Sequence, residues 1–94
     1  LSSTACLCSR FPFGLEITRD KLKRVEESET FLKRLGFSVC RVRCFPLETA
    51  VVEIDDMEKA LECKEVIVPA LRDKGFLFVT LDLEGFAVGR QARA

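Results

Sequence analysis

The sequence predicts an α+β domain, an α/β two-layer sandwich in the order α-β-β-α-β, with a small mixed three-stranded sheet and two helices on one face. Two observations predict this class. The spacing of the apolar residues switches between a helical period and a period of two along the chain. A strand, a helix and a strand also follow one another in the second half, which favours a right-handed parallel crossover.

The first predicted helix covers about residues 19–35, after a predicted loop at residues 1–16. Thr18 is its expected N-cap, Asp20 lies in the first turn, and Gly36 supplies the C-terminal stop. The residues expected to face the core are Leu22, Val25, Leu32 and Leu35, with Phe31 at the border. Those expected on the solvated face are Lys23, Arg24, Glu27 and Arg34.

Two strands are predicted next, at residues 38–45 and 49–54, and they form an antiparallel hairpin across Pro46 and Leu47. In the first strand one face carries Val39, Arg41, Arg43 and Phe45, and the other carries Cys40, Val42 and Cys44. The alternation therefore separates the arginines from the cysteines.

A second helix is expected from Asp55 or Asp56 to about Lys74, before Gly75. Pro69 lies inside it, and an interior proline loses one backbone hydrogen bond. We therefore expect a kink or break between residues 65 and 69. Residues 76–83 form the last predicted strand.

The composition indicates one globular domain, residues 1–94, with a modest core. Fifteen basic and fifteen acidic residues give a formal net charge of zero, which argues against nucleic acid as a partner. The chain has no apolar run of transmembrane length and no signal-peptide pattern, so we expect no membrane partner. Five cysteines without a CxxC pair argue against a disulfide framework and favour a cytoplasmic location. The chain lacks an initiating Met, which suggests a fragment of a larger protein.

Residues 5–14 (ACLCSRFPFG) form the first candidate site, because they place a thiol, a hydroxyl and a guanidinium within five residues, before a stiff aromatic-proline turn. Arg41 and Arg43 form the second, because two guanidiniums on one strand face can clamp an anion. The alternative for these arginines is an ordinary solvated strand face.

Four segments together resemble the C-terminal region of LarE-type PP-loop sulfur transferases: residues 6–14, 17–29, 41–43 and 81–86. The resemblance implies an N-terminal PP-loop domain, absent from these residues, that uses ATP and Mg to adenylylate a carboxylate of a pyridinium dicarboxylate mononucleotide. A cysteine thiolate then attacks the acyl-adenylate. Cleavage of the thioester on its cysteine side leaves a thiocarboxylate on the substrate and dehydroalanine on the protein. The product is a precursor of the nickel-pincer nucleotide cofactor, and members of the family tend to form homo-oligomers.

The same resemblance implies roles for individual residues. Cys6 matches the sulfur donor, and a guanidinium such as Arg10 would lower the pKa of its thiol. The residues that match substrate-binding positions are Ser9, Arg10, Arg41 and Arg43. Glu29, preferred to Glu26, matches an acidic residue that assists the proton abstraction. Each residue also has a purely structural alternative. Cys6 would be a small buried residue, Ser9 and Arg10 would form a cap or a salt bridge, and Glu26 and Glu29 would be charges on a helix surface.

The sequence departs from the family at several positions. Cys8 and Cys44 are cysteines at positions where the family usually has other residues. Together with Cys6 they would be the candidate ligands of a [4Fe-4S] cluster, which some family members are thought to hold on three cysteines. Buried structural thiols are the preferred interpretation of Cys40, Cys44 and Cys63. Val51 and Ala87 stand where the family has arginines, so a related sulfur acceptor remains open.

The leading functional hypothesis is the sulfur-donor and substrate-binding domain of an ATP-dependent sulfur transferase, inactive on its own. This expectation follows from the absence of a phosphate-cradling SGGxDS-type loop in the chain. The alternatives are a non-catalytic oligomerisation or docking module and a cysteine-ligated iron-sulfur domain.

Overall fold

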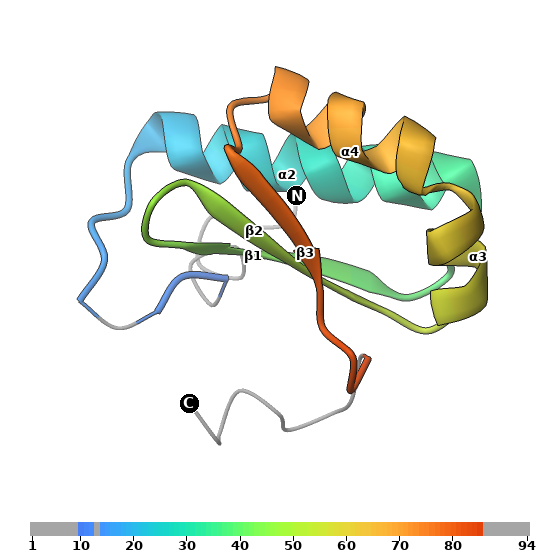
Figure 1. Ribbon diagram of the computed structural model, residues 1–94. Helices are drawn as coiled ribbons and strands as arrows, with labels where there is room; N and C mark the ends of the chain where they lie inside the picture. Colours follow the sequence, from blue (N-terminus) through green and yellow to red (C-terminus); the bar gives the residue numbers. More distant parts are fainter. Residues whose placement is uncertain (1–9, 13, 86–94) are drawn as a thin grey trace.

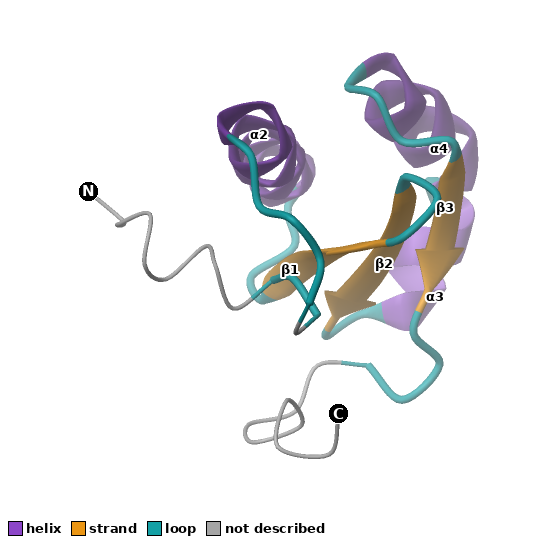
Figure 2. Ribbon diagram, turned by 90° about the vertical axis from the view of Figure 1, so that its left-hand side faces the viewer, coloured by secondary structure: helices purple, strands orange, loops and turns teal. Residues whose placement is uncertain are grey.

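The computed structural model describes residues 10–12 and 14–85. In these residues a three-stranded sheet carries α2 (Arg19–Leu35) and α4 (Lys64–Asp73) on one face, as Figures 1 and 2 show. The short α3 (Met57–Glu62) precedes α4 at one end of the sheet. The predicted α-β-β-α-β order is confirmed, with α3 and α4 together in the place of the second helix. No helix in the described part of the chain is long and apolar enough to cross a membrane.

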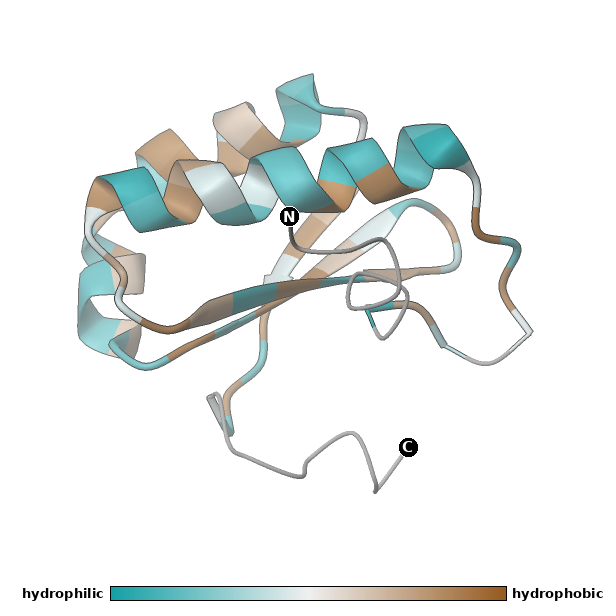
Figure 3. Cartoon of the chain, turned by 180° about the vertical axis from the view of Figure 1, so that it is seen from behind, coloured by the Kyte–Doolittle hydropathy of each residue, from teal (hydrophilic) through white to brown (hydrophobic). Residues whose placement is uncertain are grey.

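Helix α2 has the bounds that the sequence predicts. The Thr18 hydroxyl accepts a hydrogen bond from the Lys21 backbone N–H at 3.2 Å, and this caps the first turn. Gly36 ends the helix at φ 111°, a conformation that a side chain would strain. Val25 and Leu32 are fully buried, and hydrophilic and hydrophobic bands follow one another along the helix in Figure 3.

The prediction that Arg24 lies on the solvated face of α2 is wrong. Arg24 is mostly buried: its guanidinium forms an ion pair with Glu48 and lies 5.4 Å from the centre of the Phe76 ring. Ser28 and Glu29 are also buried, so the inner face of α2 is wider than its apolar residues indicate. Arg24 and Glu29 extend the buried face because their charges find partners, whereas the buried Ser28 hydroxyl has no hydrogen-bond partner among the described residues.

The antiparallel hairpin of β1 (Cys40–Phe45) and β2 (Thr49–Ile54) is confirmed, although β1 begins two residues later than predicted. Phe45 pairs with Thr49 across a three-residue turn. Within that turn Leu47 and Glu48 have φ of 65° and 54°, in the left-handed region. Cys40, Val42 and Cys44 are buried on the helix side, as the alternation predicts.

Strand β3 (Phe78–Leu81) pairs in parallel with β2, which gives the strand order β1-β2-β3. It is shorter than the predicted strand because Phe76 turns into the core and only four residues pair with β2. The Glu48 carbonyl accepts hydrogen bonds from the N–H groups of Leu77, at 2.8 Å, and Phe78, at 3.3 Å. The hairpin turn therefore holds the start of β3.

The helical segment between β2 and β3 breaks at Cys63, which lies between α3 and α4 with φ −98° and ψ 8°. The expected break at residues 65–69 is therefore wrong. Pro69 lies within α4, where it removes one hydrogen bond from a helix that continues to Asp73. Asp56, one of the two predicted caps, accepts a hydrogen bond from the Lys59 N–H at 3.0 Å.

The core lies between the sheet and the helices. Its largest fully buried side chains are Phe76, Leu32, Ile54, Leu71, Val25 and Val42. The opposite face of the sheet bears no helix among the described residues, and it presents the arginines of β1.

Candidate functional site

A carboxylate from α2 fixes Arg10 at the outer edge of β1. The Arg10 guanidinium donates to both oxygens of Glu29: Nε to Oε2 at 2.6 Å and Nη2 to Oε1 at 3.1 Å. The Val42 N–H also donates to Glu29 Oε2, at 2.8 Å. The Arg10 carbonyl accepts the Cys44 N–H at 2.9 Å. Arg10 and Glu29 therefore cap backbone donors of this edge strand, and the bidentate pair fixes the orientation of the guanidinium.

A second buried ion pair lies on the helix-free face of the sheet. Arg43 Nε donates to Glu53 Oε2 at 2.7 Å, and the side chains are 13% and 5% exposed. The two residues lie diagonally across the hairpin, because the direct partner of Glu53 in the register is Arg41. Glu53 Oε1 is buried without a hydrogen-bond partner in the described part of the chain.

Arg41 lies close enough to the other two guanidiniums to be affected by their charges. Burial lowers the pKa of Arg41, and the positive charges of Arg10 and Arg43 lower it further, while Glu53 and Glu29 oppose that shift. Three guanidiniums and two carboxylates thus form one cluster, which we call the arginine cluster. Its excess of positive charge in partly desolvated surroundings suits an anionic ligand.

The structure brings together four of the six predicted catalytic and substrate-binding residues: Arg10, Glu29, Arg41 and Arg43. The other two, Cys6 and Ser9, lie outside the described residues. Of the two glutamates considered for the acidic position, Glu29 contacts Arg10, whereas Glu26 is exposed. Sequence reasoning missed Glu53. The sequence offered one sign of Glu53, an acidic residue within a strand of β-branched residues. In the hairpin register Glu53 pairs with Arg41, so it lies on the same face of the sheet as the two arginines.

The described cysteines lie away from the arginine cluster or in the core. Cys40 and Cys44 are buried, and burial raises the pKa of both thiols. Cys63 is half-buried between α3 and α4. In residues 10–12 and 14–85 no three Cys, Asp, Glu or His side chains are grouped as metal ligands. Cys44 faces the helices, so it does not fit a [4Fe-4S] site beside the arginines. Cys6 and Cys8 lie outside the described range.

Comparisons with known proteins add a functional context. No family model matches the chain. It is 41% identical over 92 residues to an uncharacterized protein of Synechocystis sp., covering 94% of this chain and 34% of that protein. It is also 41% identical over 80 residues to an uncharacterized protein of Methanocaldococcus jannaschii, covering 84% of this chain and 31% of that protein.

A third relative has a named activity. The chain is 36% identical over 90 residues to the pyridinium-3,5-bisthiocarboxylic acid mononucleotide synthase of Lactiplantibacillus plantarum. This similarity covers 94% of the chain and 32% of the synthase. The chain thus spans about a third of the length of the curated relatives that it matches. A relationship to this synthase agrees with the sulfur-transferase resemblance of the four sequence segments.

Proposed function

We propose that the chain is the sulfur-donor and substrate-binding domain of an ATP-dependent sulfur transferase that acts on an adenylylated pyridinium carboxylate nucleotide. One observation carries the proposal: the arginine cluster gathers Arg10, Arg41 and Arg43, and buried carboxylates orient two of them. The similarity to a synthase of a pyridinium bisthiocarboxylic acid mononucleotide supports the substrate class.

The arginine cluster would bind the anionic part of the substrate. Phosphate and carboxylate oxygens accept paired hydrogen bonds from guanidinium groups, and such charge-assisted bonds are among the strongest in proteins. An anion would also relieve the repulsion among the three guanidiniums, which lowers the pKa of Arg41. The Ser9 hydroxyl is the further donor that we assign to the substrate.

Cys6 is the sulfur donor in this proposal. Its thiolate attacks the acyl carbon and releases AMP, which leaves a thioester. A base then removes the cysteine Cα proton while the Cβ–S bond breaks. The electron pair of that bond stays on sulfur, so the substrate becomes a thiocarboxylate and the protein retains dehydroalanine.

Glu29 fits the positioning of Arg10 better than the role of that base. Its carboxylate already accepts three hydrogen bonds, two of them from the Arg10 guanidinium. To take a proton in this geometry, Glu29 would have to be released by Arg10. We therefore assign it first to holding Arg10 and the edge of β1 in place.

ATP and magnesium belong, in this proposal, to an N-terminal PP-loop domain. The present sequence has no phosphate-cradling glycine-rich loop. The relatives are about three times as long as the segment they share with this chain, which is compatible with a separate activating domain.

The decisive experiment is intact mass spectrometry of the chain joined to its PP-loop domain, before and after incubation with ATP, magnesium and the dicarboxylate nucleotide. Sacrificial donation converts cysteine to dehydroalanine, so we expect a loss of about 34 Da, the mass of H₂S, at Cys6. The Cys63→Ser variant should behave as the wild type, and Cys6→Ser should make no product. Sulfurated product without a loss of mass would contradict single-use donation by Cys6.

Substrate binding is tested separately, by calorimetry with nicotinate mononucleotide as the probe. The Arg41→Gln substitution should weaken binding by roughly tenfold, because a charge-assisted contact to the anion is lost. Arg34→Gln changes an exposed arginine on α2 and serves as the matched control. Equal affinities of the two variants would contradict the assignment of the arginine cluster.

A further inference from the structure

Among the described residues, the outer edge of β3 presents backbone groups that no other strand pairs with. In the described residues β3 pairs with β2 alone. Phe78 and Asp82 donate their N–H groups toward the β2 side, to the carbonyls of Glu48 and Val52. Because direction alternates along a strand, Val79 and Leu81 turn their N–H and C=O groups outward. Such an edge is a template for another strand, whereas the β1 edge is capped by Arg10 and Glu29.

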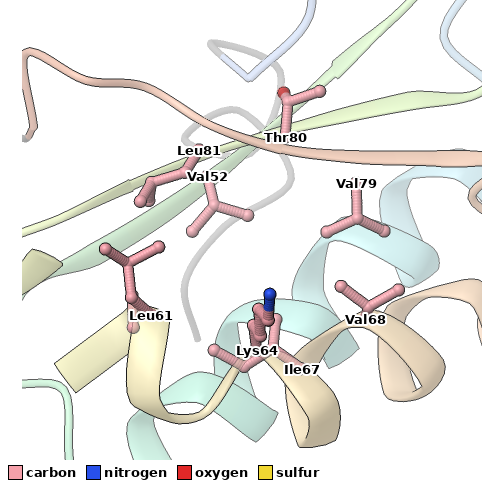
Figure 4. A pocket seen from close by; sticks show the side chains of 9 residues that line it. Val52, Leu61, Lys64, Ile67, Val68, Val79, Thr80 and Leu81 are labelled. Atoms are coloured by element: carbon pink, nitrogen blue, oxygen red, sulfur yellow. The ribbon is translucent and has the colours of Figure 1, made fainter. Parts of the chain in front are cut away.

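An apolar hollow of about 200 Å³ lies beside this edge, between β3 and the two helices α3 and α4. Figure 4 shows Leu61 and Val68 on the helical side of the hollow and Val79 and Leu81 on the strand side. Lys64 lies on the helical side, between Leu61 and Val68. Leu61 is 62% exposed, although it borders a hollow lined mainly by apolar side chains. Exposed apolar surface of this kind marks a contact site.

Helix α4 carries an acidic and a basic residue that would complement those of a second α4 packed antiparallel to it. Glu65, Val68 and Arg72 are three and four residues apart, so they form one stripe along α4. Glu65 and Arg72 are separated by seven residues, about 10.5 Å of helix, which is too far for direct pairing within α4. Both are exposed, and neither forms an ion pair with another described residue.

We propose that a second copy of this chain covers this surface, which comprises the outer edge of β3 and the stripe on α4. A twofold axis would place the two β3 strands antiparallel and the two α4 helices antiparallel at the same time. Glu65 of each copy then faces Arg72 of the other, and Val68 lies near the axis. The stripe is self-complementary in charge only in this antiparallel arrangement, which is why we favour a second copy over another occupant.

The arrangement also satisfies the strand edge. Pairing β3 with its copy around Val79 places Phe78 opposite Thr80, and their side chains share the helix-free face, as antiparallel pairing requires. Val79 and Leu81 turn toward the hollow, and Leu77 of the second copy, which is 61% exposed in a single chain, then lies opposite Leu81. The homo-oligomer expected from the family resemblance acquires a specific interface, and this interface does not depend on the sulfur-transfer proposal.

Charge reversal tests the interface through sedimentation and light scattering of the chain over a range of concentrations. The Glu65→Arg and Arg72→Glu variants each place like charges opposite one another, so each should weaken self-association by roughly tenfold or more. Mixing the two variants restores both ion pairs, so the mixture should form a heterodimer with near wild-type affinity. Glu27→Arg, on the exposed face of α2, should leave association unchanged.

A further variant keeps the test decisive if the charge pairs contribute little to affinity. Val68→Lys places a like charge from each copy beside the twofold axis without changing β3, and it should also produce monomers. Circular dichroism of each variant establishes that the fold is retained. A monomeric wild type at all concentrations would overturn the proposal. So would a folded Val68→Lys variant that still dimerises, or a mixture of the two reversed variants that stays as weak as its parts.

Discussion

Two buried carboxylates determine how the arginines of the candidate site are held. Glu29 fixes Arg10 and Glu53 fixes Arg43, and both carboxylates are less than a tenth exposed. A buried charge is tolerated when it has a partner and hydrogen bonds. Each carboxylate therefore orients a guanidinium of the proposed anion site, and each depends on that guanidinium for its own burial.

Replacing Glu29 with Gln should both destabilise the chain and weaken anion binding. The amide has one acceptor oxygen, so it cannot accept all three hydrogen bonds from Arg10 and Val42. We expect the free energy of unfolding, measured in urea, to fall by about 1–3 kcal/mol. Glu26→Gln, one turn away and exposed, should change it by less than about 0.5 kcal/mol. If the Glu29→Gln variant were as stable as this control, the hydrogen bonds of Glu29 with Arg10 and Val42 would contribute nothing to the stability of the fold.

The Arg43 and Glu53 pair should behave as one unit. Removing Arg43 leaves the Glu53 carboxylate buried without this partner, so Arg43→Met alone should cost about 3 kcal/mol or more. Adding Glu53→Leu to Arg43→Met should recover much of that loss, because the buried carboxylate is then removed as well. A double-mutant cycle from chemical unfolding measures the coupling. Additive single effects would indicate that the two residues act independently.

At the scale of elements, the hairpin turn between β1 and β2 contains local strain. Leu47 and Glu48 both adopt positive φ, which costs a non-glycine residue roughly 1–2 kcal/mol. Glu48 compensates through its ion pair with Arg24 and through its carbonyl, which holds β3. The Leu47 side chain is 76% exposed and offers little in return.

Leu47→Gly should therefore stabilise the chain by up to about 1 kcal/mol, because glycine adopts this conformation without steric cost. Leu47→Asn should give a smaller gain in the same direction, since asparagine tolerates the left-handed region. Thermal and urea unfolding measure both variants. A loss of stability in Leu47→Gly would mean that the greater freedom of the unfolded chain outweighs the relieved strain.

At the scale of the whole molecule, local patterns predicted the architecture well. The bounds of α2, the antiparallel hairpin and the buried face of β1 follow from caps and alternation that lie within single segments. The errors arose where distant segments meet. The pairing of Arg24 with Glu48 depends on how the helix packs on the hairpin, and the pairing of Arg43 with Glu53 depends on the strand register. The break at Cys63 has no proline or glycine to mark it, and α4 tolerates Pro69.

The candidate site was predictable only in part, for the same reason. The residues with the relevant chemistry, Arg10, Arg41 and Arg43, were recognisable from the sequence. Glu29 was found among them through the family resemblance. Its contact with the Val42 backbone could not be anticipated, because it joins positions thirteen residues apart on different elements. Glu53 needed the strand register before its partner could be seen.

The packed layer between helices and sheet holds two thiols that should limit stability in alkali. Burial raises the pKa of Cys40 and Cys44 above the ordinary value of 9.0. In the unfolded chain these thiols ionise near pH 9, and in the folded chain they do so at higher pH. The unfolded state thus binds fewer protons in that window, and the free energy of unfolding should fall as pH rises above about 9.

Unfolding in urea at a series of pH values measures this loss. The Cys40→Ala/Cys44→Ala double variant should be less stable at neutral pH but should show a flatter alkaline limb, because the two thiols no longer titrate. A wild-type limb no steeper than that of the double variant would contradict the assignment. Alkylation followed by peptide mapping gives an independent check, since Cys63 should react before Cys40 and Cys44.

The position of Glu48 has a consequence for anyone who engineers this chain. Exposed hairpin turns are usual places to insert an epitope or a fluorescent reporter. Here the last residue of the turn contacts α2 through Arg24 and receives two backbone hydrogen bonds from the start of β3. An insertion next to Glu48 would therefore disturb three segments that are far apart in the sequence.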